Sequence, residues 1–490
     1  MSFFRFLLKD KQENSQREST IHKQKQKPTL EAIKQEFSNC DDLVEQSFDQ
    51  IGITILFFGH LIEPNMFNRD IVEPLTSIRS EEFHSLMERK QYQKVKTSDD
   101  TVQAILKGYV AIFDKKETYI VNAFGPKERS ISQSETESII TGAHDSFVES
   151  MNTNISLIRR RLNTPKLKVK KFAIGDLSNT SVFLLYIEDI VNPDLLKELE
   201  NRISNVKTDI VADSSMFVQL IDNSPHSVFP QFFTTERPDV VVNKLASGKI
   251  AGLTDHSPNA FTTPTNFFEF FESPDDNNQR WIVGTLVKWM RYVAFIVTLC
   301  FTALYVSATT YSYEIIPQTI LMSLAESRDR VPFPPLVEAL ILEIALELLR
   351  EAGVRLPTKI GQTIGIVGGI VIGQAAVDAG LVSNTLIIVV AISAISSFVI
   401  PNYILSATLR IARFMLIILA GAFGNFGLVV GLVLLIIHLG SLTNLGTPYV
   451  NPVAPMHPKD LLLYFIRPPH GMKKYRPTQS ISPEPDKRQK

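Results

Sequence analysis

The pattern of apolar and polar positions divides the chain into two halves. Before residue 281, short apolar stretches alternate with charged ones, which is typical of a soluble α/β protein. Beyond residue 291, apolar runs without Asp, Glu, Lys or Arg recur, and runs of about 20 such residues are long enough to span a bilayer. We therefore predict an α/β N-terminal region of two subdomains, followed by an all-α polytopic transmembrane domain.

Individual elements of the N-terminal half follow from periodicity and turn residues. Alternating or continuous apolar stretches predict strands, and apolar residues at three- and four-residue steps predict helices. Pro165, in a polar turn, marks the boundary between the two predicted subdomains. Strands are predicted at 51–58, 108–113, 118–123, 168–174, 181–187 and 216–221, and helices at 135–162 and 193–206.

The uncharged runs define the predicted membrane region and its orientation. Lys288 and Arg291 lie immediately before the first run, and the positive-inside rule then places the N-terminal region in the cytoplasm. The runs cover 292–313, 361–409 with Asp378 as their one charge, and 414–458.

Between the first two runs lies a helix with repeated acids, LVEALILEIALELLREAG. Glu343, Glu347 and Glu351 are spaced by four and share one face, and Glu338 precedes them. In lipid, each unpaired carboxylate would carry a large free-energy cost. Three interpretations stay open: an amphipathic helix at the membrane surface, a helix lining a water-filled path that favours cations, or a buried helix with protonated acids in a proton relay.

A stripe of glycines follows, with Gly361, Gly365, Gly369 and Gly373 at a spacing of four. Interior glycines weaken a helix in water, but small residues let two helices pack closely in a membrane. We interpret the stripe as a packing and assembly surface, and a lipid-facing helix with this spacing by chance is the alternative. No Gly-Lys-Ser/Thr follows, which excludes a phosphate-binding loop of that type.

The number of spans depends on the acidic helix. The last apolar run, 414–439, carries several glycines and Asn425, so it is either broken midway or closely packed. If the acidic helix does not cross, four apolar runs return the basic tail to the cytoplasm. If it crosses, the tail lies outside unless the last run is a hairpin. We expect four full spans and one amphipathic or re-entrant helix.

Shifts in composition divide the chain into six predicted parts. Both ends are polar, and the C-terminal end is also basic and Pro-rich. The parts, in order, are a disordered polar tail (1–30), a first α/β subdomain (31–164), a second α/β subdomain (165–273), a juxtamembrane connector (274–290), a helical transmembrane domain (291–466) and a basic flexible tail (467–490).

Composition narrows the classes of function. The formal net charge of −1 gives no sign of a nucleic-acid partner. Two cysteines, Cys40 and Cys300, indicate no disulfide scaffold, and no Cys/His cluster has the spacing of a metal site. His144 and Asp145 are adjacent on a predicted helix and point in different directions, so they make no catalytic pair. We expect no enzyme activity, no cofactor and no metal.

Five motifs resemble the A subunit of the GerA-type spore germination receptors, over about residues 45–470. The chain departs from the family pattern at 141–143, where it has Thr-Gly-Ala, and at His256, in a turn expected to need φ > 0. The motifs are SFVESMNTNISLIRRRL (146–162), FPQFFTTERPDVVVNKL (229–245), VPFPPLVEAL (331–340), ELLREAGVRLP (347–357) and GQTIGIVGGIVIGQAAVDAGLVS (361–383).

The resemblance implies a multi-pass subunit in the inner membrane of dormant bacterial endospores, with its N-terminal region on the core side. It implies action together with a transporter-like B subunit, to which nutrient recognition is mainly attributed, and with a lipoprotein C subunit. For the family, a homo-oligomer, namely a pentamer, is proposed as a nutrient-gated channel for monovalent cations. The alternative function is a non-conducting scaffold that couples the B subunit to a separate channel.

Three groups of residues are therefore candidates for function. The candidate ion path uses acids, the assembly surface uses glycines, and a basic triplet at the end of the predicted long helix is a candidate intersubunit contact. The acids are Glu338, Glu343, Glu347, Glu351 and Asp378; the glycines are Gly361, Gly365, Gly369 and Gly373; the basic triplet is Arg159, Arg160 and Arg161.

Overall fold

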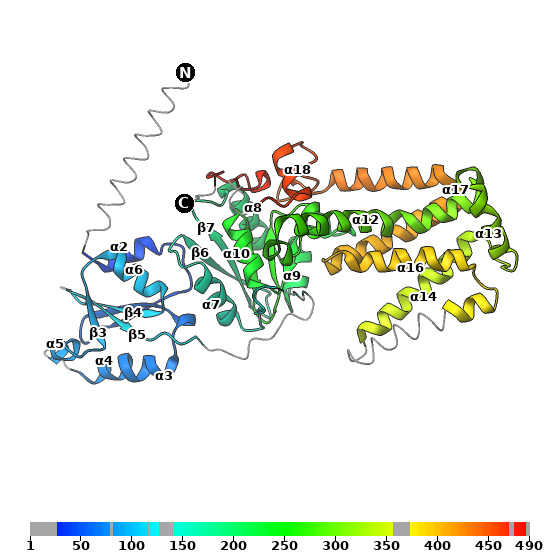
Figure 1. The fold of residues 1–490 in the computed structure, drawn as a ribbon. Helices are drawn as coiled ribbons and strands as arrows, with labels where there is room; N and C mark the ends of the chain where they lie inside the picture. The colour runs from blue at the N-terminus through cyan, green and yellow to red at the C-terminus, as the bar shows by residue number, and fades with distance from the viewer. Residues whose placement is uncertain are drawn as a thin grey trace, which may run out of the picture.

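Three parts follow one another along the molecule: two α/β parts, each built on its own sheet, and a long helical bundle (Figure 1). The bundle points away from the two sheets, so the protein is elongated (Figure 1). The computed structural model describes residues 27–78, 82–115, 117–126, 137, 139, 141–355, 373–469 and 475–486.

The first α/β part is an antiparallel sheet with helices on both faces. Its strands are β1 (Leu43–Phe48), β2 (Ile53–Phe58), β3 (Tyr92–Val95), β4 (Tyr109–Phe113) and β5 (Thr118–Asn122), in the order β1-β2-β4-β5-β3. Alternate residues of β2 point to opposite faces, with Ile55 and Phe57 in one apolar cluster and Leu56 and Phe58 in the other. The predicted strands at 51–58, 108–113 and 118–123 are confirmed by β2, β4 and β5, and the last two pair as a hairpin.

Short helices cover both faces of this sheet. Residues of β2 and β4 pack against the two helix groups in separate apolar clusters. On one face lie α2 (Leu30–Glu36) and α6 (Ser98–Leu106), and on the other lie α3 (Pro64–Phe67), α4 (Glu73–Ser77) and α5 (Phe83–Met87).

The second α/β part has the same layered construction. Its strands are β6 (Leu167–Ile174), β7 (Thr180–Ile187), β8 (Phe233–Thr235), β9 (Ile250–Thr254) and β10 (Ala260–Thr263), in the antiparallel order β6-β7-β9-β10-β8. One face carries α7 (Met151–Arg161) and α10 (Pro238–Ala246), and the other carries α8 (Pro193–Ser204) and α9 (Ser214–Ile221). The predictions of strands at 168–174 and 181–187 and of a helix beginning at Pro193 are confirmed.

The predicted strand at 216–221 is wrong, because these residues belong to helix α9. The side chain of Asp213 accepts a hydrogen bond from the backbone N–H of Met216 and so caps the helix. Phe217 and Ile221 are buried four residues apart, which is the spacing of one helical face.

The predicted long helix at 135–162 is shorter in the structure. Only α7 is helical there, and the described residues 141–150 form no helix. The side chain of Asn154 explains the late start, because it bonds both the N–H and the carbonyl of Val148 and so holds the chain in a turn. Although α7 lies before the predicted boundary at residue 164, it packs on the second sheet.

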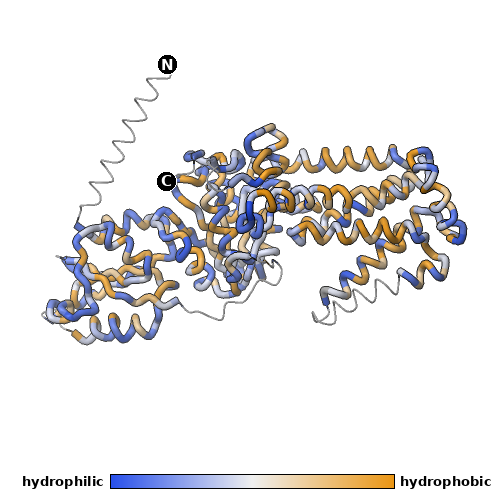
Figure 2. Tube along the Cα trace, in the orientation of Figure 1, coloured by the Kyte–Doolittle hydropathy of each residue, from blue (hydrophilic) through white to orange (hydrophobic). Residues whose placement is uncertain are grey.

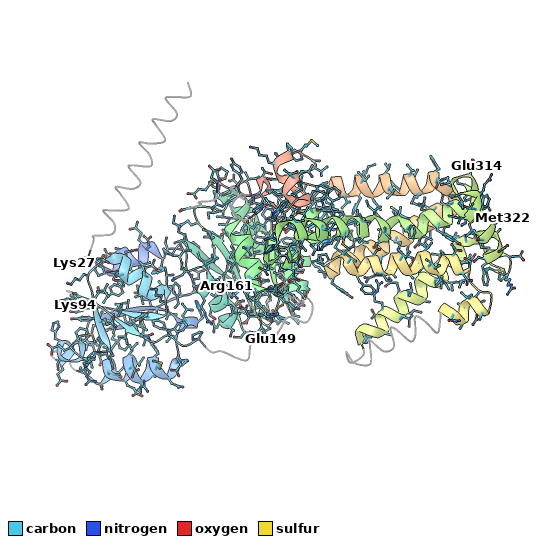
Figure 3. All side chains as sticks on the ribbon, in the orientation of Figure 1. Lys27, Lys94, Glu149, Arg161, Glu314 and Met322 are labelled. Atoms are coloured by element: carbon cyan, nitrogen blue, oxygen red, sulfur yellow. The ribbon has the colours of Figure 1, made fainter. Side chains whose placement is uncertain are left out.

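The bundle is built from α12 (Trp281–Thr310), α14 (Pro335–Arg355), α16 (Asn384–Val399) and α17 (Tyr403–Ser441), with α13 (Gln318–Arg328) at its far end (Figure 1). Within the described residues, α12 and α17 are long and apolar enough to cross a membrane, and α16 is apolar but shorter. Apolar residues dominate these helices (Figure 2). Glu314 and Met322 lie at the bundle end farthest from the sheets (Figure 3).

Helix α17 folds back on itself at Gly424, whose φ of 64° and ψ of −145° are not helical. Its two halves then run side by side, so that a Cβ on Gly431 would meet Leu416 at 2.5 Å. Asn425 accepts from Ser307 and donates to Ser312, which ties the turn to the far end of α12. Of the two alternatives left open for the last apolar run, a midway break or close packing, the structure shows the break at Gly424.

The chain after α17 returns to the second α/β part through α18 (Pro458–Phe465). Beyond it, Ser480 donates to the carbonyl of Ser247, and Ser482 donates to the carbonyl of Ile190. Asn192 also donates to the carbonyl of Ile481, so residues 475–486 of the predicted flexible tail have hydrogen-bond partners on the second α/β part.

Candidate functional site

A cluster of charged side chains lies inside the helical bundle, between α14 and α17. Glu343 is fully buried, and its Oε2 lies 2.5 Å from Nη2 of Arg413, which is also buried. Thr302 of α12 donates a hydrogen bond to Oε1 of Glu343 at 3.1 Å. Arg413 donates to Oγ of Ser393 in α16 at 3.1 Å. The pair therefore joins all four helices of the bundle.

A second carboxylate, Glu347, lies one turn further along α14 and is shared by three arginines. Its Oε1 is 3.1 Å from Nε of Arg410, 3.4 Å from Nη1 of Arg350 and 3.7 Å from Nη2 of Arg413. The guanidinium of Arg350 also lies over the ring of Phe398, 4.8 Å from its centroid. The Glu347 side chain remains 28% exposed, so this end of the cluster opens to the surroundings.

The spacing of charges in the sequence explains why the cluster forms. Glu343 and Glu347 are four residues apart, and Arg410 and Arg413 are three apart, so each pair occupies one face of its helix. Charges inside an apolar bundle are stable only with partners, and removing one member of a buried pair leaves the other charge uncompensated. The acidic face of α14 and the basic face of α17 therefore pack against each other.

Glu338 lies in a separate buried site near the start of α16. Its Oε2 accepts a hydrogen bond from the backbone N–H of Ser383 at 3.1 Å, and its Oε1 lies 3.5 Å from Nη2 of Arg328. The hydroxyls of Ser383 and Tyr305 are 3.2 Å apart. This arrangement attaches the start of α14 to α13 and α16.

The remaining predicted acids lie on the outside. Glu351 is 61% exposed and pairs with Arg355 one turn further along α14. Asp378 is exposed in the helical residues 373–378. The structure thus brings Glu343 and Glu347 together in one cluster and leaves Glu338, Glu351 and Asp378 apart from it.

Most of the predicted glycine stripe lies outside the described residues. Gly361, Gly365 and Gly369 are not among them, and Gly373 is. A Cβ placed on Gly373 would meet nothing within 4 Å. The assembly surface stays a prediction.

The predicted basic triplet is divided by the structure. Arg159 is fully buried and makes two hydrogen bonds to Asp42, at 2.6 and 2.8 Å, so it joins the second α/β part to the first. Its guanidinium also lies 4.1 Å from the centroid of the Phe58 ring. Arg161 pairs with Asp145, and Arg160 is exposed. Only Arg160 and Arg161 therefore keep surface for a contact with another subunit.

His60 completes this junction between the two sheets. Its Nε2 lies 3.8 Å from Oδ2 of Asp42, and both side chains are buried. Burial lowers the pKa of His60 to about 4, because desolvation disfavours the imidazolium, and the nearby carboxylate of Asp42 opposes that shift only in part. His60 is therefore neutral at pH 7, and Arg159 alone balances the charge of Asp42.

Sequence reasoning missed the two arginines of α17 that partner the acids of α14. Arg410 and Arg413 precede the last uncharged run, and no prediction links them to α14. The signal that would have found them is the match between two acids and two bases, each pair one turn apart, inside otherwise apolar segments.

The described residues include no group of three or more His, Cys, Asp or Glu side chains arranged to hold a metal ion. The bundle cluster mixes carboxylates with guanidinium groups in contact. Its chemistry is that of ion pairing and of water or ion access.

Comparison with known proteins identifies relatives of the chain. The family model described as Bacillus/Clostridium GerA spore germination protein matches residues 31–479. Spore germination protein GerQA of Bacillus cereus is 43% identical over 465 residues, which cover 93% of each chain. Spore germination protein GerLA of Bacillus cereus is 42% identical over 386 residues, which cover 78% of each chain.

A third sequence relative agrees. Spore germination protein KA of Bacillus subtilis (strain 168) is 35% identical over 451 residues, or 90% of this chain and 83% of that one. The crystal structure of the N-terminal domain of the A subunit of the Bacillus megaterium spore germinant receptor GerK3 has a TM-score of 0.38 and 23% identity, covering 49% of this chain and 94% of that one. The resemblance predicted from the motifs is confirmed by the family model and the sequence relatives, and the chain belongs to the GerA spore germination protein family.

Proposed function

We propose that this chain is a multi-pass A subunit of a spore germinant receptor in the inner membrane of the spore. Several copies assemble, together with B-type and C-type subunits, and the assembly conducts monovalent cations when nutrient is sensed. The α/β region lies on the cytoplasmic, or core, side. Family membership supports the role in germination, and the two apolar helices α12 and α17 support the membrane location.

The observation that carries the conducting role is the charge cluster inside the bundle. Ionisable groups within a membrane are costly and are retained where ions or protons have to be handled. The cluster of Glu343, Glu347 and their arginines lies among helices that are otherwise apolar. Glu351 continues the same helix face toward the surface, so repeated copies of α14 around an axis would present rings of carboxylates.

The test is conductance of the purified full-length chain in lipid bilayers. Glu351→Gln removes an exposed carboxylate of the proposed path without touching the buried pair, and we expect a several-fold loss of preference for cations over anions. Glu198→Gln is the matched control, because Glu198 also forms an i,i+4 pair with an arginine, on α8 of the soluble part. An unchanged preference in Glu351→Gln, with normal protein amounts, contradicts the proposed path.

The second candidate is a non-conducting scaffold that passes a signal from the B-type subunit to another channel. One observation favours it: Glu338 and Glu343 are fully buried and have partners within the chain. Absence of conductance from the chain alone and from its complex with the other subunits would support this function.

A further inference from the structure

We propose that Arg410 and Arg413 of α17, together with Glu343 and Glu347 of α14, form an ion-pair latch that holds α14 closed against the bundle. Release of this latch is the step that lets water and cations reach the inner face of α14. The inference rests on the proposed conducting role, and it adds the residues that keep the path shut.

The first step is the asymmetry of α14. Its inner face is buried, with Ala339 and Glu343 fully covered one turn apart. Its outer face is apolar and exposed, as Ile344 at 52% and Leu348 at 66% indicate. In the described part of the chain, Glu343 finds its partners on α12 and α17, and Glu347 pairs with arginines of α17 and with Arg350 of α14 itself.

The second step is the charge within the cluster. Three guanidinium groups, those of Arg350, Arg410 and Arg413, face the two carboxylates of Glu343 and Glu347. One positive charge is in excess, so the closed cluster repels a cation at this level of the bundle. The closed latch thus keeps the two carboxylates away from any cation path. Its excess positive charge is also an electrostatic barrier in that path.

The third step is the incomplete hydrogen bonding of the latch. Among the described residues, Nε of Arg413 and Oγ1 of Thr298 are buried polar atoms without a hydrogen-bond partner. Unsatisfied groups of this kind weaken a buried network and favour the entry of water. Three ion pairs of the latch therefore hold α14 to α17, and the unsatisfied polar atoms beside them gain hydrogen bonds when water enters.

The fourth step is the position of the latch relative to the start of α14. Glu338 binds the N–H of Ser383 and pairs with Arg328, which ties the start of the helix independently. Beyond the latch, Glu351 pairs with Arg355 within α14, and Arg350 donates to Oγ of Ser397 in α16 at 3.3 Å. Loss of the latch therefore leaves the later turns of α14 held to the bundle by Arg350 and by apolar contacts, while the first turn stays attached through Glu338.

The experiment measures access to the inner face by cysteine labelling. In the full-length chain with Cys40→Ser and Cys300→Ser, Leu342→Cys places a thiol on the buried side of α14 next to Glu343, beyond the first turn that Glu338 holds, where the native side chain is 8% exposed. A water-soluble maleimide reacts slowly with it while the latch is closed. Arg413→Gln leaves Glu343 without its partner, and we expect labelling at least about tenfold faster. Arg410→Gln is the milder second variant.

Two variants separate the latch from general damage. Arg355→Gln removes an arginine of α14 whose partner lies on the same helix, so we expect labelling at the wild-type rate. Glu343→Arg combined with Arg413→Glu restores a pair of opposite charge, and we expect it to return the labelling to the slow rate. An exchange variant that labels as fast as Arg413→Gln, or an Arg413→Gln chain that labels slowly at normal protein amounts, overturns the latch.

Cation release from liposomes loaded with potassium is measured in parallel. Faster labelling together with raised release in Arg413→Gln supports both the latch and the conducting role. Faster labelling without any release supports the latch and contradicts the conducting role. Failure of the latch and failure of the conducting role therefore give different results.

Discussion

Single residues decide how this protein accommodates charge in its interior. Arg159 is the example in the soluble region, because one buried guanidinium satisfies Asp42 and closes the junction between the two sheets. Arg413 has the corresponding role in the bundle, where it satisfies Glu343. In both places the charge is tolerated because its partner comes from a distant stretch of the chain.

Arg159→Met tests the junction. The substitution keeps much of the apolar volume but leaves Asp42 buried beside a neutral His60, and losing one member of a buried pair costs about 3–5 kcal/mol. We expect faster amide hydrogen exchange in β1, β2 and α7 of the full-length protein. Arg160→Met is the control, since an exposed substitution on the same helix changes stability by about 0.5 kcal/mol or less. Equal exchange in the two variants contradicts the role of Arg159.

The sequence predicted the basic helix end but not what it contacts. Cations are favoured at a helix C-terminus whatever else they do, so the triplet alone does not distinguish its members. Arg159 differs from Arg160 because its position on α7 points inward, toward a carboxylate 117 residues earlier in the chain. A contact between residues so far apart in the chain cannot be predicted from the local sequence pattern.

At the scale of helices and strands, the structure likewise depends both on the local sequence pattern and on contacts with residues distant in the chain. Glycines in the last apolar run left a break and close packing as alternatives, and α17 is a hairpin. The turn forms at Gly424 because the next residue, Asn425, bonds Ser307 of α12 and Ser312 just beyond that helix. The short apolar run at 216–221 was predicted as a strand because periodicity cannot separate a short buried helix from a strand.

Gly424→Ala tests the hairpin. The φ and ψ of Gly424 lie in a region that only glycine adopts readily, and a Cβ there would meet Cβ of Tyr311 at 3.1 Å. We expect a loss of about 1–3 kcal/mol in the free energy of unfolding, measured by titration with sodium dodecyl sulfate. Gly440→Ala is the control, because nothing lies within 4 Å of that position and Ala favours a helix by up to about 1 kcal/mol. A Gly424→Ala chain as stable as wild type contradicts the turn.

At the scale of the whole molecule, the sequence predicted two α/β units, a helical region and acids that need partners or water. Both sheets and the helical region are present. The partners of the acids were not predictable, because Glu343 and Arg413 lie on separate helices and meet only through the packing of the bundle. The docked segment 475–486 was missed for the same reason, since its polar residues bind backbone groups of a distant part.

That docked segment carries a prediction about topology. It contacts loops of the second α/β part, which also precedes α12. We therefore expect both to lie on one side of the membrane and the bundle to cross it an even number of times. His438, near the end of α17, lies 3.0 Å from Oγ of Ser227, so the second half of the hairpin returns to the same side. The far side then holds the turn at Gly424 and the residues between α12 and α14.

Single cysteines in a cysteine-free chain test this arrangement in sealed vesicles with a membrane-impermeant maleimide. Lys94→Cys and Lys459→Cys, both at exposed positions on the α/β side, should react from the same face of the membrane. Glu314→Cys and Asp329→Cys, exposed at the far end of the bundle, should react from the opposite face. Labelling of Lys459→Cys together with Asp329→Cys would mean an odd number of crossings. In that case the segment 475–486 could not reach the second α/β part. The basic tail would also lie outside the cytoplasm, which is contrary to the positive-inside rule.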